Sequence, residues 1–286
     1  MSWFYLALLV IFLNGAESIL NRFFLKKEKD SNAYALLFHI IGIILFLFLF
    51  AIEWNLPSKP EAWLIAIVAA ILWTAIAVIS FKACRVADVS LKTPIARSKI
   101  FWALLFAAII IGETITLDKI IGSILIFIGV LIVSVDLNKK FGGFNDPGVK
   151  LTLLFAFLMG IVVVIDKLAM NYFQPSIYGF LQYLLPGIFL FAAIPNRINR
   201  MKKLVKRNGI LLIITGMLVP IGYWILLKVY QTAEVSSVIP VLESSVIISM
   251  LGGIIFLGER KDLIRRALGA IIVLIGVLII KGAIIW

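Results

Sequence analysis

The sequence predicts an all-α membrane protein with ten transmembrane helices, arranged as two inverted-topology repeats of five helices. Three observations predict this fold: the apolar composition, ten apolar stretches of helix length, and a register of Pro, Gly and Glu residues shared by both halves. Hydrophobic residues occupy 63% of the 286 positions, 15% are charged, and the mean hydropathy is +1.11. A soluble domain carries about a quarter charged residues, because water must solvate its surface. Lipid is therefore the expected solvent for most of this surface.

Each apolar stretch is expected to form a helix, because the bilayer core offers no hydrogen-bond partner to a free backbone group. About 20 apolar residues are needed to cross it. The first stretch lacks a basic segment before it, so we interpret it as a retained helix and not as a cleaved signal peptide. The predicted helices cover residues 3–25, 33–53, 61–82, 90–111, 119–137, 150–171, 177–195, 209–230, 236–257 and 264–285.

The two halves carry matching residues at a nearly constant separation. Matches between Leu or Ile residues carry little weight in such a chain, whereas matching Pro, Gly and Gly-Glu positions are harder to obtain by chance. Shifts of 145 to 147 residues superpose Gly15 on Gly160, Pro94 on Pro240, Ser98 on Ser244, Gly112-Glu113 on Gly258-Glu259, Gly122 on Gly269 and Gly129 on Gly276. We therefore predict a first repeat over residues 1–137, an inter-repeat loop over 138–149 and a second repeat over 150–286.

Five helices per repeat is an odd number, so the second copy must enter the membrane in the opposite orientation. Secondary transporters use this inverted arrangement and hold their substrate near the bilayer midplane, between the repeats. The glycines of the fifth and tenth helices are expected to let these two helices pack closely. They are Gly122, Gly129, Gly269 and Gly276.

The basic residues lie mostly in short clusters between the apolar stretches. There are 27 Lys and Arg against 15 Asp and Glu, a formal net charge of +12. Such clusters are typical of topology signals and of contacts to anionic lipid headgroups. Loops after odd-numbered helices carry most of them, which places these loops in the cytoplasm and both termini outside. The longest basic stretch, 196–208, is expected to be one of these loops.

Ionisable side chains inside a bilayer are costly, and by default they face the protein interior and mark function. At about 1.5 Å per residue, Glu17, His39 and Arg97 lie about 9–12 Å below the face that carries the odd-numbered loops, so they are expected to form one cluster. One hypothesis is that Glu17 takes a proton and Arg97 binds an anionic group. The alternative is a structural Glu17–Arg97 ion pair, with His39 as a core residue.

In the second half, Glu243 occupies the position equivalent to Arg97 with the opposite charge. Asp166 and Lys167 are expected at a similar depth and close to Glu243, so each half is predicted to hold its own charged cluster, one toward each face. Lys99, two residues from Arg97, should point elsewhere and is a weaker candidate. Glu113 and Glu259 follow the fourth helix of each half, where the helix dipole disfavours anions, so we interpret them as structural.

The register of Pro94 with Pro240, and of the Gly-Glu pairs that end the same helices, resembles the EamA-type members of the drug/metabolite transporter superfamily. This resemblance implies a ten-helix carrier for small metabolites, often amino acids or other polar solutes, usually with both termini in the cytoplasm, opposite to the charge bias. Glu17 in the first helix also resembles the glutamate that couples protons in small multidrug resistance transporters. The predicted cavity-lining residues, which packing roles could equally explain, are Trp73, Pro94, Gln182, Tyr183, Tyr223 and Pro240.

The chain carries no nucleotide-binding, metal-binding or nucleophile motif. We therefore predict a secondary-active transporter, with a small polar metabolite such as an amino acid or related zwitterion as substrate and a proton as candidate coupling ion. The alternatives are a lipid-linked substrate flippase, a non-transporting membrane assembly subunit, and an intramembrane lipid enzyme using Glu17 and His39. Expected partners are the substrate and the lipid bilayer of the plasma membrane, as a monomer or homodimer, with no nucleic acid, cofactor or metal.

Overall fold

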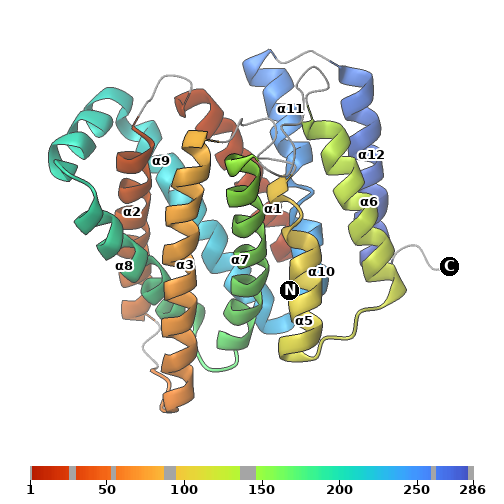
Figure 1. Ribbon diagram of the computed structural model, residues 1–286, viewed down its shortest axis with the longest axis horizontal. Helices are drawn as coiled ribbons and strands as arrows, with labels where there is room; N and C mark the ends of the chain where they lie inside the picture. The colour runs from red at the N-terminus through yellow and green to blue at the C-terminus, as the bar shows by residue number, and fades with distance from the viewer. Residues whose placement is uncertain are drawn as a thin grey trace.

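The computed structural model describes residues 2–25, 30–52, 56–86, 95–135, 146–258 and 262–282, and within these it contains helices and no strands. Figure 1 shows the helices side by side in one bundle. They are α1 (Trp3–Leu25), α2 (Ser31–Ile52), α3 (Pro60–Val86), α5 (Lys99–Ile111), α6 (Leu117–Ser134), α7 (Pro147–Ala169), α8 (Pro175–Ala193), α9 (Arg197–Thr232), α10 (Val235–Leu242), α11 (Ser245–Leu257) and α12 (Leu263–Ile280).

Nine segments in the described part of the chain are long and apolar enough to cross a membrane, with α10 and α11 forming one of them. The tenth is the apolar helix α5, whose 13 residues follow a part of the chain outside the described residues. Large apolar side chains cover the outer surface, among them Phe48 (67% exposed), Ile109 (69%) and Phe256 (75%). Lipid is the solvent that suits such a surface, so the prediction of an all-α, ten-helix membrane protein is confirmed.

Equivalent helices make equivalent contacts in the two repeats. Helix α1 packs on α9 and α11, and α7, its equivalent, packs on the matching helices α3 and α5. A Cβ atom added to Gly15 would lie 2.4 Å from Ile248, and one added to the equivalent Gly160 would lie 2.3 Å from Trp102. Because Trp102 and Ile248 are themselves 146 residues apart, the two contacts are related by the repeat. The structure thus confirms the two inverted repeats.

Helices that are each other's equivalents pack together on either side of the bundle, α6 with α12 and α2 with α8 (Figure 1). Between α6 and α12 the backbones touch at glycines. A Cβ atom added to Gly129 would lie 2.6 Å from the carbonyl oxygen of Gly269. One added to Gly276 would lie 2.7 Å from the carbonyl oxygen of Gly122. Only Gly allows this approach, so the prediction that these residues serve close packing of the fifth and tenth helices is confirmed.

The two ends of the bundle are named here by their connections. The even-loop face carries the connections 56–59, 112–116, 170–174 and 233–234, and the odd-loop face is the opposite end (bottom and top of Figure 1). At the even-loop face, the Glu113 carboxylate accepts hydrogen bonds from the backbone N–H groups of Val235 and Ser236, both at 2.8 Å. A carboxylate is favourable at this helix N-terminus, which agrees with a structural role for Glu113. Glu259 lies outside the described residues.

The basic stretch 196–208, expected as a loop, is helical in the structure. It forms the first part of α9, between Asn196 (φ 51°) and Gly209 (φ 61°, ψ −150°), where the chain bends into the membrane-spanning part. Its Arg, Lys, Leu and Met residues are good helix formers. Leu204 is 3% exposed and packs with Tyr34 and Leu212. Tertiary packing on the bundle therefore makes a helix of a segment whose charge suggested a loop.

Replacing Gly209 with Ala is expected to lower stability by about 1–3 kcal/mol, because φ 61° with ψ −150° is open in practice only to Gly. Thermal unfolding of the detergent-solubilised protein measures the loss. Gly222→Ala is the matched control, since an added Cβ atom there has no neighbour nearer than 3.6 Å. A Gly209→Ala protein as stable as the wild type would show that the fold does not depend on this backbone conformation at residue 209.

Asp30 joins the start of α2 to the basic part of α9. Its carboxylate accepts hydrogen bonds from Arg200, at 2.7 Å from Nε and 2.5 Å from Nη2, and from the backbone N–H of Ala33 at 3.1 Å. The hydrogen bonds from the Arg200 side chain are the main reason why the pKa of Asp30 lies below its ordinary value. The pair is partly exposed, with 29% and 27% of its side-chain surfaces accessible.

Asp30→Asn is expected to cost up to about 1 kcal/mol at neutral pH. A carboxyl whose pKa is lower in the folded than in the unfolded state stabilises the fold above its unfolded pKa, about 3.9. This contribution is lost as the pH falls through the lower folded pKa. The wild type and Asp30→Asn should therefore differ in melting temperature at pH 7 and converge in strong acid. A difference in melting temperature that stays the same from pH 7 to strong acid would contradict a stabilising Asp30–Arg200 ion pair.

Candidate functional site

The fourth helix of the second repeat is interrupted near its middle. Helix α10 ends at Leu242 and α11 begins at Ser245, and the Ser244 N–H and hydroxyl both bond to the carbonyl of Val241. The first repeat has the same break: the Ser98 N–H and hydroxyl bond to the carbonyl of Ile95 just before α5. The serines that the sequence aligned thus make equivalent turns. Each turn leaves a charged side chain, Glu243 or Arg97, at the break.

Glu243 lies between two cations from the first repeat. Its carboxylate forms an ion pair with Arg97 through one oxygen and with Lys99 through the other, the latter at 2.9 Å. The Glu243 side chain is 3% exposed, whereas Arg97 and Lys99 retain 25% and 22% of their side-chain surfaces. The carboxylate is therefore enclosed, while both cations keep part of their side-chain surface accessible. We call these three residues the axial cluster.

The position of the axial cluster follows from the repeat. Arg97 and Glu243 are 146 residues apart, the same shift that superposes the two halves. Two equivalent residues can touch only near the pseudo-two-fold axis that exchanges the repeats. In inverted repeats this axis lies in the plane of the membrane, so the pair marks the midplane between the halves.

The arrangement of charges differs from the one expected from the sequence. Two separate clusters were predicted, one toward each face, with Arg97 near Glu17 and Glu243 near Asp166. The structure joins Arg97 and Glu243 instead. Counting residues along a helix gives the depth of a Cα atom, but not the direction of a long side chain. Lys99 was expected to point elsewhere, but the turn at residues 97–98 interrupts the helical spacing and brings Lys99 to the same carboxylate.

Asp166 in α7 is the centre of a second polar group. The Tyr178 hydroxyl donates to Oδ1 at 2.7 Å, the Tyr223 hydroxyl to Oδ2 at 2.9 Å, and the Trp73 indole N–H to Oδ1 at 3.3 Å. Asp166 is 1% exposed, and no cation of the described residues lies within ion-pair distance of it. One buried carboxylate thus connects α7 with α3, α8 and α9. The neighbouring Lys167 donates to the Tyr230 carbonyl at the C-terminal end of α9, where a cation is favourable.

Aromatic rings form a row from α2 to α3. Tyr183 is 5.6 Å from His39 and 6.0 Å from Tyr223, measured between ring centroids, and Tyr223 is 5.8 Å from Trp73. The His39 Nδ1 atom lies 2.8 Å from the Ala35 carbonyl. Glu17 lies in α1, which packs on α9 and α11. His39 and Trp73 of the first repeat and Tyr183 and Tyr223 of the second therefore lie in one row.

The remaining candidates have mixed surroundings. Gln182 is 4% exposed and donates from Nε2 to the Ala66 carbonyl at 3.1 Å, while its Oε1 has no hydrogen-bond partner among the described residues. Pro240 is buried within α10. Pro94 lies outside the described residues. Tyr178 had not been singled out from the sequence, since a tyrosine near a helix start gives no signal of a buried partner.

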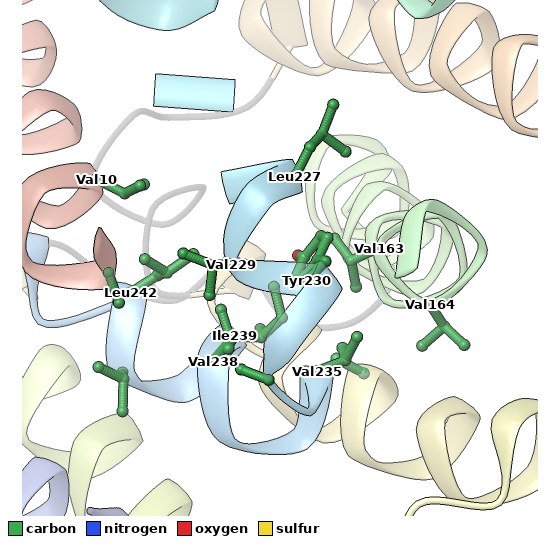
Figure 2. Close-up of a cluster of buried hydrophobic side chains, with 14 of the residues drawn as sticks. Val10, Val163, Val164, Leu227, Val229, Tyr230, Val235, Val238, Ile239 and Leu242 are labelled. Atoms are coloured by element: carbon green, nitrogen blue, oxygen red, sulfur yellow. The ribbon is translucent and has the colours of Figure 1, made fainter. Parts of the chain in front are cut away.

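Buried apolar side chains pack together toward the even-loop face. Figure 2 shows Val163 of α7 pointing toward Tyr230 of α9, with Val235 and Ile239 of α10 nearby and Val164 on the other side of α7. All five are at most 5% exposed. The Asp166 group and the bonds of Glu113 lie at the same end. These contacts join α7, α9 and α10 toward the even-loop face.

A family model described as the EamA-like transporter family matches residues 1–135 and 146–282, once in each half. The chain belongs to the EamA-like transporter family. A solved structure described as "Crystal structure of protein" has a TM-score of 0.77 to this EamA-like chain, over 98% of this chain and 96% of that one. Their sequence identity of 12% makes this a shared fold alone. No curated protein matches the chain.

Membership in the EamA-like family confirms the resemblance predicted from Pro94, Pro240 and the Gly-Glu pairs. Together with the apolar helices, it identifies the chain as an integral, multi-pass membrane protein of a transporter family.

Proposed function

We propose that the chain is a secondary-active carrier of the plasma membrane, not an enzyme, and moves a small polar metabolite by alternating access between its two repeats. The observation that carries this proposal is the axial cluster, where the broken fourth helices of both repeats meet. Transporters of inverted topology bind substrates at helix breaks near the midplane. Rocking of one repeat against the other would expose this cluster to each face in turn.

The axial cluster favours a substrate with a carboxylate. Arg97 and Lys99 keep accessible surface and present guanidinium and ammonium donors, which bind carboxylates well. A substrate carboxylate would bind the accessible parts of these two cations beside Glu243. Glu243 keeps both cations paired when no substrate is bound, and a buried charge left alone would be costly.

The aromatic row favours an ammonium group on the same substrate. The faces of Tyr183, Tyr223 and Trp73 are suited to hold a cation, because an aromatic ring has a negative face. Carboxylate and ammonium together describe an amino acid or a related zwitterion. Glu17, a carboxylic residue inside the membrane-spanning helix α1, is the proposed proton-coupling residue.

A thermal-shift screen of the purified protein against amino acids and related zwitterions tests this substrate class. A zwitterionic ligand should raise the melting temperature, whereas its methyl ester should have little effect. Arg97→Lys keeps the charge but loses the planar guanidinium, so it should weaken the ligand shift more than the basal stability. Equal shifts for acid and ester, or for both proteins, would contradict the assigned carboxylate site.

Proton coupling is tested separately with Glu17→Gln in proteoliposomes. This variant should lose accumulation driven by a pH gradient and keep downhill exchange, since only the protonation step is removed. A stable Glu17→Gln protein whose gradient-driven uptake is unchanged would exclude Glu17 from coupling and leave the substrate site unaffected.

A further inference from the structure

The first part of α9, residues 197–208, is a short separate helical segment, which we call the basic helix. Left-handed backbone at Asn196 and the bend at Gly209 separate it from α8 and from the membrane-spanning part of α9. It carries six Lys and Arg residues and no Asp or Glu. In Figure 1 it lies at the upper left, beside the upper end of α2.

The inner face of the basic helix is fixed to the bundle. Leu204 is buried against Tyr34 and Leu212, and Arg200 bonds to Asp30. The Arg197 guanidinium lies 4.0 Å from the centroid of the Phe191 ring. These contacts fix the rotation of the basic helix about its axis. They therefore determine which side chains point away from the bundle.

The outer face of the basic helix is strongly cationic. Lys202, Lys203, Lys206 and Arg207 are all exposed. No acidic residue occurs between positions 196 and 210 of the sequence. Four basic residues within about two helical turns produce a concentrated positive surface.

The depth of the basic helix is that of the lipid headgroups. It packs beside Tyr34 and Leu212, where the apolar spans 32–51 and 212–232 begin. Large apolar side chains are exposed at its start and just after the Gly209 bend: Ile198 is 53% exposed and Ile210 is 67% exposed. Such side chains belong in hydrocarbon, so the lysines between them lie at its boundary, as in helices that rest in the membrane interface.

We propose that the outer face of the basic helix binds the headgroups of anionic phospholipids in the leaflet at the odd-loop face. Charge complementarity and depth both select this partner, because each Lys or Arg near an anionic membrane surface contributes favourable binding energy. The bound lipids hold the basic helix against the end of α2 and stabilise the bend at Gly209. The proposal does not depend on the transported substrate.

Fluorescence quenching in vesicles tests this lipid preference. The full chain carries a fluorophore at Asn199→Cys, an exposed position of the basic helix, in a Cys84→Ser background. Vesicles contain phosphatidylglycerol and phosphatidylcholine, with bromine atoms on one lipid at a time. Brominated phosphatidylglycerol should quench more strongly at equal content, and added salt should reduce this difference.

The triple variant Lys202→Gln, Lys203→Gln and Lys206→Gln should lose the preference, with a fall of at least about fivefold in the ratio of lipid binding constants. Replacing the exposed Lys59, Lys82 and Lys150 with Gln removes the same charge elsewhere and should leave the ratio unchanged. Soluble glycerol phosphate should not compete, which separates a lipid headgroup from a free phosphate. Equal quenching by both lipids in the parent protein would overturn the proposal, as would an equal loss in both triple variants.

Discussion

Glu243→Gln is expected to destabilise the protein by about 3 kcal/mol, because Arg97 and Lys99 lose the enclosed carboxylate that balances their charge. Breaking a buried ion pair costs about 3–5 kcal/mol. The lower value applies here, since the two cations keep 25% and 22% of their surfaces accessible. Thermal and denaturant unfolding in detergent measure the loss.

Because the two repeats are pseudo-symmetric, a second variant is expected to recover part of this lost stability. Exchanging the two charges, with Arg97→Glu and Glu243→Arg in one protein, should restore part of the lost stability, because the residues occupy equivalent positions beside the axis. Arg97→Glu alone places a carboxylate against Glu243 and should be the least stable of the set. If the exchange protein is no better than its single variants, the contact at the axis is not the source of the stability.

Asp166→Ala is expected to cost about 3 kcal/mol as well, for a different reason. It removes the acceptor of three donors, the buried Tyr178 and the half-buried Trp73 and Tyr223. A hydrogen bond contributes about 0.5–1.5 kcal/mol net, and a donor left without an acceptor inside the bundle adds a desolvation penalty. Hydrogen exchange should show the loss concentrated in α3, α8 and α9, at the even-loop face.

Two tyrosines provide matched controls for this prediction. Tyr223→Phe removes one bond to Asp166 and should cost about 1.5 kcal/mol. Tyr183→Phe removes the same hydroxyl from the same aromatic row and should change stability little, because Tyr183 makes ring contacts. Equal effects of the two tyrosine variants would mean that the Asp166 group does not hold these helices together.

The sequence predicts the architecture well because lipid limits the possible structures. With no water in the bilayer core, apolar stretches of about 20 residues must become helices, and an odd number of them forces the repeats to be inverted. The glycine matches were equally informative, since Gly129 and Gly276 face a neighbouring backbone that leaves no room for a Cβ atom.

The charged residues were harder to place from the sequence. Their selection rested on the cost of a charge in lipid, which identified Arg97, Asp166 and Glu243 but not their partners. Arg97 meets Glu243 because both project from helix breaks toward the axis, and the sequence carries no measure of that direction. For Asp166, the partners Trp73 and Tyr178 come from other helices, and only the packing of α3 and α8 on α7 brings them together.

Exchange across the membrane tests the carrier account most directly. The protein is reconstituted into proteoliposomes preloaded with an unlabelled zwitterion that raises its melting temperature, and uptake of the labelled compound is followed without any gradient. A carrier that alternates about the Arg97–Glu243 axis should take up label faster when the vesicles are preloaded, and the rate should saturate. Label uptake that is absent, or unaffected by preloading and linear in concentration, would contradict alternating access.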